Sequence, residues 1–246
     1  MNSVPGRSWR VIEAGKRKRV ETVDDIPAFD TSLELPKMRL LWSVIAKEEN
    51  IMTLAEHWNS RYEAGTTPWD SGLPSRELKL RIEEQKLGPC RVLELGCGSG
   101  TNAVFLAELG FDVTATDCSD VALSRGKALA DEREVTVDWI CGDVCELDFG
   151  EPFPFVFDRG CFHCCRRERM PILPAFERAT TVGSKMLVLT GNANEEREHG
   201  PPQLTEAELR VELRSLFTVD SLREFYFEDP GGIQGPLGWS CWMTRK

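Results

Sequence analysis

The spacing of apolar positions changes along the chain, from a helical period in the first third to short strands and helices afterwards. Over residues 33–64, apolar side chains recur at intervals of three and four, which predicts two helices, and Gly65 and Pro68 end the second. A further helix is expected over residues 75–86. From residue 89 onward strands alternate with helices, an order typical of a mostly parallel sheet with right-handed crossovers.

The expected strands are short runs rich in apolar and β-branched residues, and they cover residues 91–95, 112–116, 135–140, 155–158, 185–190, 218–227 and 237–244. The expected helices between them cover residues 101–109, 119–133, 168–180 and 206–216. The last two strands form a hairpin that should add one antiparallel strand at the edge of the sheet. The sequence therefore predicts an α/β protein with a Rossmann-like, doubly wound, mostly parallel seven-stranded sheet, an antiparallel C-terminal strand and an N-terminal helical lid.

Composition divides the chain into an extension and one domain. Residues 1–32 mix basic, acidic and proline residues without periodicity, so we expect a flexible extension. Residues 33–246 form the domain, with a helical lid over 33–88 and the Rossmann-like core over 89–246. The basic run at residues 16–19 is expected to be a solvated part of the extension, with a nuclear signal or an anion contact as alternatives.

The overall charge and hydropathy restrict the possible partners. The formal net charge of −10 disfavours binding to nucleic acid through the general surface. No apolar run approaches the roughly 20 residues that a membrane span requires, and the N-terminus lacks a hydrophobic signal core. We therefore expect a cytoplasmic monomer that binds a small molecule and contacts neither nucleic acid nor membrane.

The nine cysteines are interpreted as reduced thiols rather than as disulfides or metal ligands. Their number is odd and no secretion signal accompanies them. Cys161 and Cys164 are spaced like a ligand pair with His163 between them, but no second pair with matching spacing exists. No metal is therefore expected, and a redox role for the same pair is disfavoured.

A glycine-rich turn between the first core strand and the next helix carries the first indication of function. Gly96, Gly98 and Gly100 allow the backbone to approach a ligand closely. Glu94 precedes the turn by two residues, and its carboxylate would repel a pyrophosphate but suits a cationic or zwitterionic ligand. The amino-acid part of S-adenosylmethionine fits this description. A nicotinamide dinucleotide is disfavoured, because Ala103 takes the place of the third glycine of its motif.

Acidic residues follow the next strands in the same way. Asp117 ends the second core strand and could accept both ribose hydroxyls. After the third strand, Asp143 could accept from an adenine amino group, and the Val144 amide could donate to the ring. Asp158 and Arg159 end the fourth strand. All four segments fall at the carboxyl ends of strands, where open α/β sheets bind ligands.

Taken in order, these motifs resemble those of the class I S-adenosylmethionine-dependent methyltransferases, over about residues 53–245. The spacing Trp58-x3-Tyr62-x6-Trp69 is similar to the lid of the thiopurine and thiol/halide methyltransferase group, and residues 199–202 resemble its Gly-Gly-Pro-Pro loop. The chain departs from that group at Tyr62, where the group has tryptophan. A second departure is Arg159, where the group has an aromatic residue.

The resemblance implies one cofactor, S-adenosylmethionine, and a set of contacts to it: Trp58, Tyr62, Trp69, Glu94, Gly96, Gly98, Asp117, Cys118, Asp143, Val144, Asp158 and Arg159. An aromatic ring face stabilises a cation such as a sulfonium by roughly 0.5–2 kcal/mol. Core packing on a helix face is the alternative role for Trp58 and Tyr62.

The expected reaction is methyl transfer to a small-molecule thiol, in line with the departing sulfonium. Arg159 and His163 are the catalytic candidates: the arginine could favour a thiolate, and the histidine could be a general base or a structural residue bonded within its loop. Transfer to nitrogen or oxygen of a metabolite or protein, or cofactor binding without catalysis, are the alternatives. Candidates on the acceptor side are Glu195, Glu196 and His199.

Overall fold

The computed structural model describes residues 52–197, 200–229 and 233–246. The expected extension, the first helix of the lid, the basic run at 16–19 and His199 lie outside the described residues.

The segment expected to form the lid contains α2 (Leu54–Glu63) and α3 (Arg76–Glu84) in its described part. The strands that follow are β1 (Arg91–Leu95), β2 (Asp112–Asp117), β3 (Asp138–Cys141), β4 (Phe155–Arg159), β5 (Lys185–Asn192), β6 (Gln203–Leu204), β7 (Phe217–Asp229) and β8 (Ile233–Arg245). The helices between them are α4 (Thr101–Glu108), α5 (Asp120–Glu132), α6 (Cys161–Arg167), α7 (Ile172–Ala179) and α8 (Glu206–Leu213).

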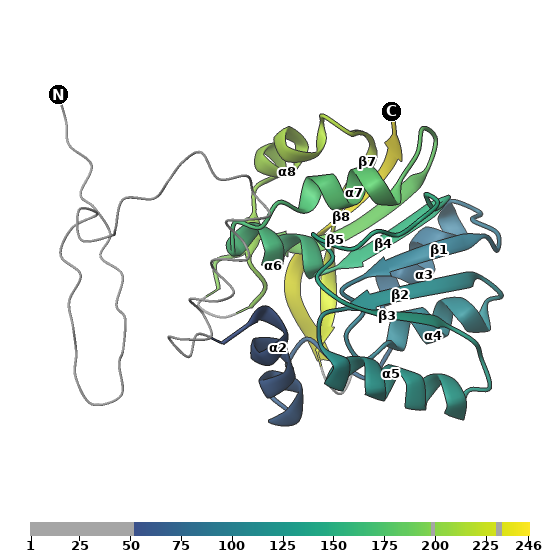
Figure 1. Ribbon diagram of the computed structural model, residues 1–246. Helices are drawn as coiled ribbons and strands as arrows, with labels where there is room; N and C mark the ends of the chain where they lie inside the picture. The colour runs from purple at the N-terminus through teal and green to yellow at the C-terminus, as the bar shows by residue number, and fades with distance from the viewer. Residues whose placement is uncertain (1–51, 198–199, 230–232) are drawn as a thin grey trace, which may run out of the picture. The chain divides into compact units, whose positions relative to one another are not determined.

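The strands form one mixed sheet in the order β3-β2-β1-β4-β5-β8-β7, with the two-residue β6 beside β5. All neighbours from β3 to β5 are parallel, and β8 is antiparallel to both β5 and β7. Helices α3, α4 and α5 cover one face and α6, α7 and α8 the other (Figure 1). The predicted fold class is therefore confirmed.

The antiparallel strand does not lie at the edge, as the sequence had suggested. Strand β8 is inserted between β5 and β7, and β7 forms the edge. Cys241 and Met243 of β8 are buried in the core beneath α6, α7 and α8, whereas Trp242 is buried on the opposite face. A strand with large apolar side chains on both faces needs a neighbour on each side and helices above and below, which explains the central position.

The helix expected over residues 168–180 is present as the shorter α7 (Ile172–Ala179), but a second helix that the sequence analysis did not predict, α6 (Cys161–Arg167), precedes it. Helix α6 begins at Cys161, and α7 begins after Pro171. Arg169, between them, has a φ of +57°, a left-handed conformation that interrupts a right-handed helix. The residues that follow β4 are thereby turned into a short helix that starts at the carboxyl edge of the sheet.

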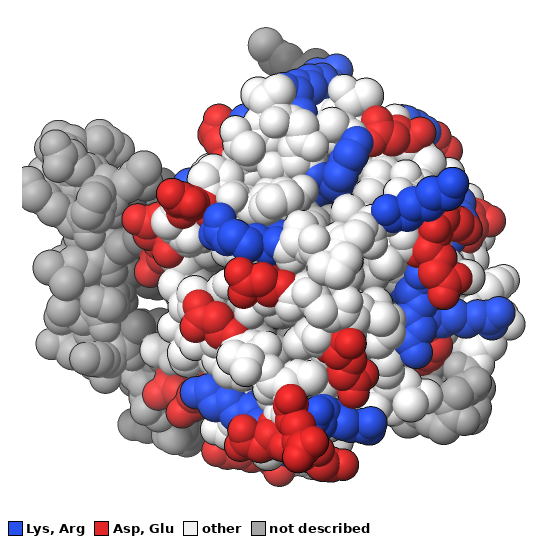
Figure 2. Space-filling view, turned by 90° about the vertical axis from the view of Figure 1, so that its right-hand side faces the viewer, with Lys and Arg blue, Asp and Glu red and all other residues white. Residues whose placement is uncertain are grey.

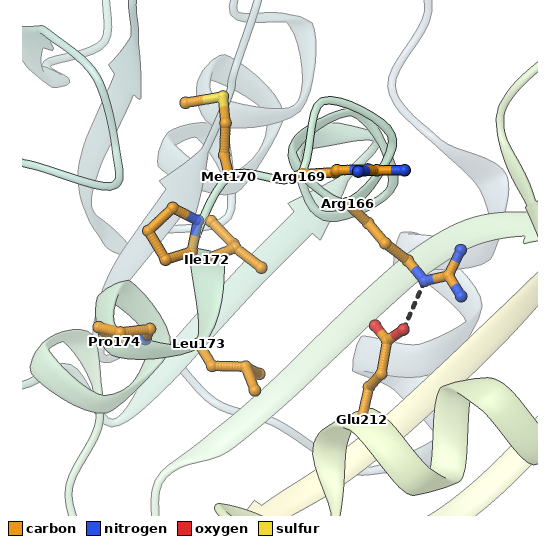
Figure 3. Close-up of a pocket in the computed structure, with 8 residues that line it drawn as sticks. Arg166, Arg169, Met170, Ile172, Leu173, Pro174 and Glu212 are labelled. Atoms are coloured by element: carbon orange, nitrogen blue, oxygen red, sulfur yellow. Dashed lines mark hydrogen bonds and ion pairs between the residues drawn. The ribbon is translucent and has the colours of Figure 1, made fainter. Parts of the chain in front are cut away.

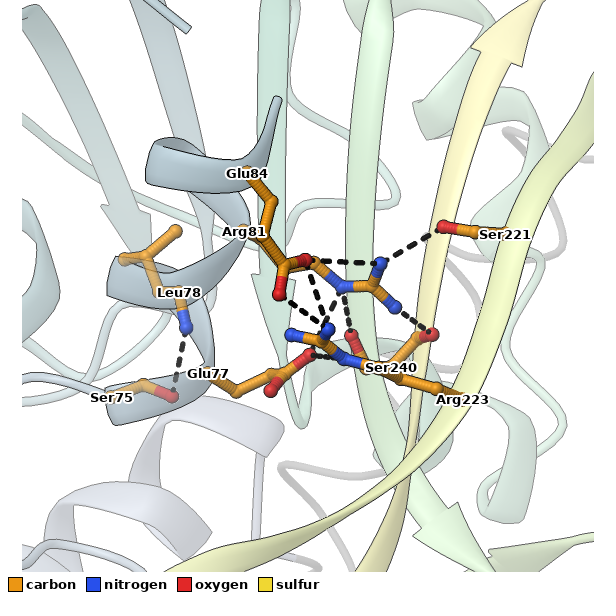
Figure 4. A network of polar contacts seen from close by, with 8 residues as sticks. All are labelled: Ser75, Glu77, Leu78, Arg81, Glu84, Ser221, Arg223 and Ser240. Atoms are coloured by element: carbon orange, nitrogen blue, oxygen red, sulfur yellow. Dashed lines mark hydrogen bonds and ion pairs between the residues drawn. The ribbon is translucent and has the colours of Figure 1, made fainter. Parts of the chain in front are cut away.

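A buried polar network fastens α3 to the C-terminal hairpin (Figure 4). Arg81, 2% exposed, donates from Nε to Glu77 at 3.0 Å and to the Ser240 hydroxyl at 2.8 Å, and from Nη1 to the Ser221 hydroxyl at 2.9 Å. Arg223 of β7 donates to the same oxygen of Glu77 at 2.8 Å. Because both arginines share one buried carboxylate, the position of α3 depends on Glu77.

The surface turned towards the viewer in Figure 2 carries basic and acidic side chains interspersed among uncharged ones. None of the helices in the described part of the chain combines the length and the apolarity needed to cross a bilayer.

Candidate functional site

The strand register brings the segments singled out in the sequence to one edge of the sheet. Leu95 of β1 is paired with Thr116 of β2 and with Asp158 of β4, and Asp117 is paired with Cys141 of β3. The glycine turn and the ends of β2, β3 and β4 therefore lie side by side at the carboxyl edge. This is the place where open α/β sheets bind ligands.

The glycine turn is held against the end of β2 by Asp117. The Gly98 amide donates to one carboxylate oxygen of Asp117 at 2.8 Å, and the Ser119 amide donates to the other at 2.8 Å. Burial raises the pKa of Asp117, and these amide hydrogen bonds partly offset the effect. Gly98 has a φ of +56°, and a Cβ on it would lie 2.5 Å from the hydroxyl oxygen of Tyr62. The lid thus rests directly on the turn, and only glycine leaves room for it.

The three lid aromatics that the sequence singled out come together. The rings of Trp58 and Trp69 meet edge to face at 5.5 Å, and those of Tyr62 and Trp69 meet at 6.2 Å. Nε1 of Trp69 donates to the Tyr62 hydroxyl at 3.4 Å. The Arg61 guanidinium lies 4.3 Å from the centre of the Trp69 ring. The cluster therefore packs a guanidinium against an indole ring, the type of contact by which an aromatic ring stabilises a cation.

Asn59 anchors the lid helix, a role that the sequence analysis missed. Its side-chain oxygen accepts from the Ser119 hydroxyl at 2.6 Å, and its amide nitrogen donates to Asp120 at 2.7 Å. Arg125 of α5 adds a bond to the Tyr62 carbonyl at 2.5 Å. The only available indication was the position of Asn59 beside Trp58, because its partners lie some sixty residues away.

Glu94 is a buried acid, and only one of its two carboxylate oxygens has a hydrogen-bond partner among the described residues. Its Oε1 accepts from the Asn102 side chain at 3.2 Å, while Oε2 is buried and has no hydrogen-bond partner among the described residues. Burial raises the pKa of Glu94 to about 8, and the hydrogen bond from Asn102 and then the charge of Arg159 partly oppose this. A buried carboxylate oxygen without a partner suits the ammonium group of an amino acid, so this position fits the amino-acid end of S-adenosylmethionine.

The residues expected around the adenine lie after β2 and β3. Asp143 is half-buried and accepts from the Cys145 amide at 2.8 Å, and Val144 is buried in the core. Cys118 is half-buried, and burial together with the charge of Asp117 raises the pKa of its thiol. The contacts of Asp143 and Val144 with an adenine ring remain predictions.

The two residues at the end of β4 differ in their surroundings. The buried carboxylate of Asp158 accepts from the Gly160 amide at 3.1 Å and from the Phe162 amide at 2.9 Å, so it caps α6. Burial raises the pKa of Asp158 to about 7. The Arg159 guanidinium donates to the Trp69 carbonyl at 3.1 Å and lies 5.2 Å from the centre of the Phe227 ring. Arg159 thereby joins β4, the lid and β7, and Phe227 had no indication in the sequence.

The other catalytic candidate, His163, is buried inside the protein. Its Nδ1 lies 3.2 Å from the Thr190 hydroxyl. Burial, followed by the charges of Arg159 and Arg167, lowers the pKa of His163 to about 3. The imidazole is therefore neutral near pH 7 and bonded within the core. This environment corresponds to the structural role considered in the sequence analysis.

The loop after β5 is tied down by Glu195, which was expected on the acceptor side. Its carboxylate accepts from the Leu237 amide at 2.8 Å and from Nε of Arg197 at 2.7 Å. Glu196 is exposed. The contacts of Glu195 thus hold this loop on β8.

A separate hollow of about 350 Å³ lies at the junction of α6, α7 and α8 (Figure 3). It is lined by Arg166, Arg169, Met170, Pro171, Ile172, Leu173, Pro174 and Glu212. Nε of Arg166 is paired with Glu212 at 2.5 Å across its rim. None of the residues expected to contact the cofactor lines this hollow.

Comparison with known proteins agrees with the geometry of the edge. The model of a methyltransferase domain matches residues 92–183. The probable S-adenosyl-L-methionine-dependent methyltransferase TehB of Haemophilus influenzae is 27% identical over 65% of this chain, and the match spans 58% of TehB. The 2-heptyl-1-hydroxyquinolin-4(1H)-one methyltransferase of Mycobacteroides abscessus is 30% identical over 65% of this chain and 72% of that protein.

The probable thiol methyltransferase 2 of Arabidopsis thaliana is 28% identical over 59% of this chain and 65% of that protein. Among solved structures, the 1,6-didemethyltoxoflavin-N1-methyltransferase of Burkholderia thailandensis, with bound S-adenosylhomocysteine, superposes with a TM-score of 0.60. It is 19% identical over 98% of this chain and all of its own. With this fold, the ordered motifs at the carboxyl edge and these relatives, the chain belongs to the class I S-adenosylmethionine-dependent methyltransferases, and S-adenosylmethionine is its cofactor.

Proposed function

We propose that the methyl group is transferred to the sulfur of a small-molecule thiol, which reacts as the thiolate beside Arg159. The observation that carries this proposal is the Arg159 guanidinium, held between the Trp69 carbonyl of the lid and the Phe227 ring. The similarity to a probable thiol methyltransferase also favours a thiol.

The residues at the carboxyl edge would hold the cofactor in one orientation. Glu94 would accept from its ammonium group, Asp117 from its ribose hydroxyls, and the lid aromatics would cover its sulfonium. S-adenosylmethionine, when bound, supplies an electrophilic methyl group. The rings of Trp58 and Trp69, which pack edge to face, would help to exclude water from the bound cofactor.

Arg159 would supply the positive charge that a thiolate needs. Free thiols ionise near pH 8.5, and an opposite charge within about 4–6 Å lowers such a pKa by about 1–3. Deprotonation then requires no side-chain base. The environment of His163 supports this division of roles, because its imidazole is bonded to Thr190 inside the core.

Methyl transfer to nitrogen or oxygen of a metabolite is the second candidate. The relatives from Mycobacteroides abscessus and Burkholderia thailandensis are named for heterocyclic acceptors, which favours it. An oxygen acceptor usually needs a positioned base. Cofactor binding without catalysis is the third candidate, and it predicts affinity without turnover.

The test is methyl transfer from labelled S-adenosylmethionine to a panel of thiols and to the matching alcohols and amines. Label on thiols alone supports the proposal. Label on alcohols or amines alone, or none on any compound while the cofactor binds, overturns it.

Arg159→Met gives a sharper test with a thiol that ionises near pH 8.5. Turnover should fall by about tenfold or more at pH 7, and the deficit should shrink towards pH 9.5, where the thiolate forms unaided. Arg210→Met removes an exposed charge from α8 and is the control. A deficit that is equally large at both pH values would contradict a role in favouring the thiolate.

A further inference from the structure

The side chain of Asn102 joins Glu94 of β1 to the start of α3. Asn102 lies in the first turn of α4, directly after the glycine turn, and is 7% exposed. Its amide nitrogen donates to Oε1 of Glu94 at 3.2 Å, and its oxygen accepts from the Ser75 amide at 2.8 Å. Neither partner belongs to α4.

These two partners fix the orientation of the Asn102 amide. The Ser75 N–H can only donate, so it must face the oxygen of Asn102, and the Glu94 carboxylate requires the nitrogen. A flipped amide would place two donors together on one side and two acceptors on the other. Asn102 therefore has a single satisfied orientation, with both bonds buried.

On one side, Asn102 determines where the spare oxygen of Glu94 points. Rotation of the Glu94 carboxylate would break the bond between Oε1 and Asn102, so this bond favours one direction for Oε2. Oε2 is buried without a partner among the described residues, and is the atom available to a ligand. The charged groups that act on Glu94 are Arg159 and Asp158 from β4 and Asp117 from β2.

On the other side, Asn102 holds the segment that carries the lid tryptophan. Ser75 is the N-cap of α3, at the end of the connection from α2 that contains Trp69. This connection, residues 64–75, is also held at the Trp69 carbonyl by Arg159. Its two anchors thus come from α4, through Asn102, and from β4, through Arg159.

We propose that Asn102 is a positioning residue that couples the Glu94 carboxylate to the lid connection, so that cofactor affinity and lid order depend on one side chain. The inference rests on the placement of the cofactor at the glycine turn given under the proposed function. It does not depend on the acceptor. Asn102 itself does not touch the reacting atoms.

Two variants separate the bond from Asn102 to Glu94 from the bond between Asn102 and the Ser75 amide. Asn102→Ala removes both bonds. Asn102→Asp keeps an oxygen that accepts from the Ser75 amide but replaces the donor to Glu94 by a second acid. Thr205→Ala removes the N-cap of α8, far along the chain, and is the control for a general loss of stability.

The measurements are the affinity for S-adenosylhomocysteine by calorimetry, turnover with saturating acceptor, and hydrogen exchange at the Ser75 amide. Asn102→Ala should weaken affinity and raise the KM for the cofactor by roughly tenfold, with kcat little changed and the Ser75 amide exchanging faster. Asn102→Asp should keep the Ser75 amide protected. Its affinity for S-adenosylhomocysteine should still fall, because an acid in place of the amide removes the donor to Oε1 of Glu94. Thr205→Ala should match the wild type in affinity.

Wild-type affinity for Asn102→Asp, or a Ser75 amide that stays protected in Asn102→Ala, would overturn the coupling. So would an equal loss in Thr205→Ala. If the wild type binds S-adenosylhomocysteine but methylates no thiol, the acceptor proposal fails and the role of Asn102 stands. If the wild type does not bind it, both fail.

Discussion

Replacing Glu94 by glutamine should make the cofactor-free protein more stable at alkaline pH and, at the same time, weaken cofactor binding. Glu94 is 2% exposed, and burial raises the pKa of its carboxyl from 4.5 to about 8. Glutamine has nearly the same shape and keeps an oxygen that can accept from Asn102, but it cannot ionise. The variant therefore removes the charge with little change in packing.

The sign and the size of the effect follow from proton linkage. The unfolded chain loses this proton near pH 4.5, whereas the folded protein keeps it to about pH 8. The contribution of Glu94 to the free energy of unfolding is thus fully present below pH 4.5 and is lost as the pH rises through about 8. Between these two pH values, each rise of one pH unit lowers the free energy of unfolding by about 1.4 kcal/mol. Between pH 6 and pH 8 the wild type should lose about 2 kcal/mol that the variant keeps.

Thermal unfolding of both cofactor-free proteins at pH 6, 7 and 8 measures this difference. Subtracting the two curves cancels the groups common to both, including Asp158 and His163. A relative gain of about 2 kcal/mol corresponds to a Tm difference that widens by about 4–8 °C for a domain of this size. Calorimetry with S-adenosylhomocysteine should show binding to the variant weakened by about tenfold or more, because a charge-assisted bond is lost. A stability difference that stays constant with pH would refute the reasoning.

Two further substitutions test the lid contact and the buried network. Gly98→Ala should weaken binding of S-adenosylhomocysteine by about tenfold, because its Cβ would lie 2.5 Å from the Tyr62 hydroxyl oxygen and its φ of +56° disfavours a side chain. Adding Tyr62→Phe should restore part of that affinity in calorimetry, and no restoration would argue against the contact. Glu77→Gln should lower the free energy of unfolding by about 3–5 kcal/mol in urea, because Arg81 and Arg223 lose the carboxylate that they share. A loss below about 1 kcal/mol would contradict that account of the network.

The sequence predicted the carboxyl edge well because its elements are encoded locally. A strand, a glycine turn and a helix follow one another within residues 91–109, and an acid lies within two residues of the end of each of the next three strands. The lid aromatics were also found, because Trp58, Tyr62 and Trp69 have a recognisable spacing, and the structure brings their rings into contact.

The failures arose where distant contacts decide local structure. Residues 161–167 have few strong helix formers, and their helix begins where amides are capped by the Asp158 carboxylate. The order of β7 and β8 depends on which strand has apolar side chains on both faces. Asn59 and Asn102 are single polar residues whose partners lie 60 and 27 positions away, so no periodicity marks them.

The distribution of charge at the carboxyl edge links stability to ligand binding. Three buried acids, Glu94, Asp117 and Asp158, lie on neighbouring strands, and burial raises the pKa of each. Backbone amides accommodate Asp117 and Asp158, whereas Glu94 keeps one oxygen without a partner among the described residues. A ligand with an ammonium and a sulfonium group would supply positive charge near Glu94, the acid of the three with the fewest hydrogen bonds to its carboxylate. Stability of the empty edge and affinity for the cofactor therefore depend on the same side chain, and a change at Glu94 that improves the first should weaken the second.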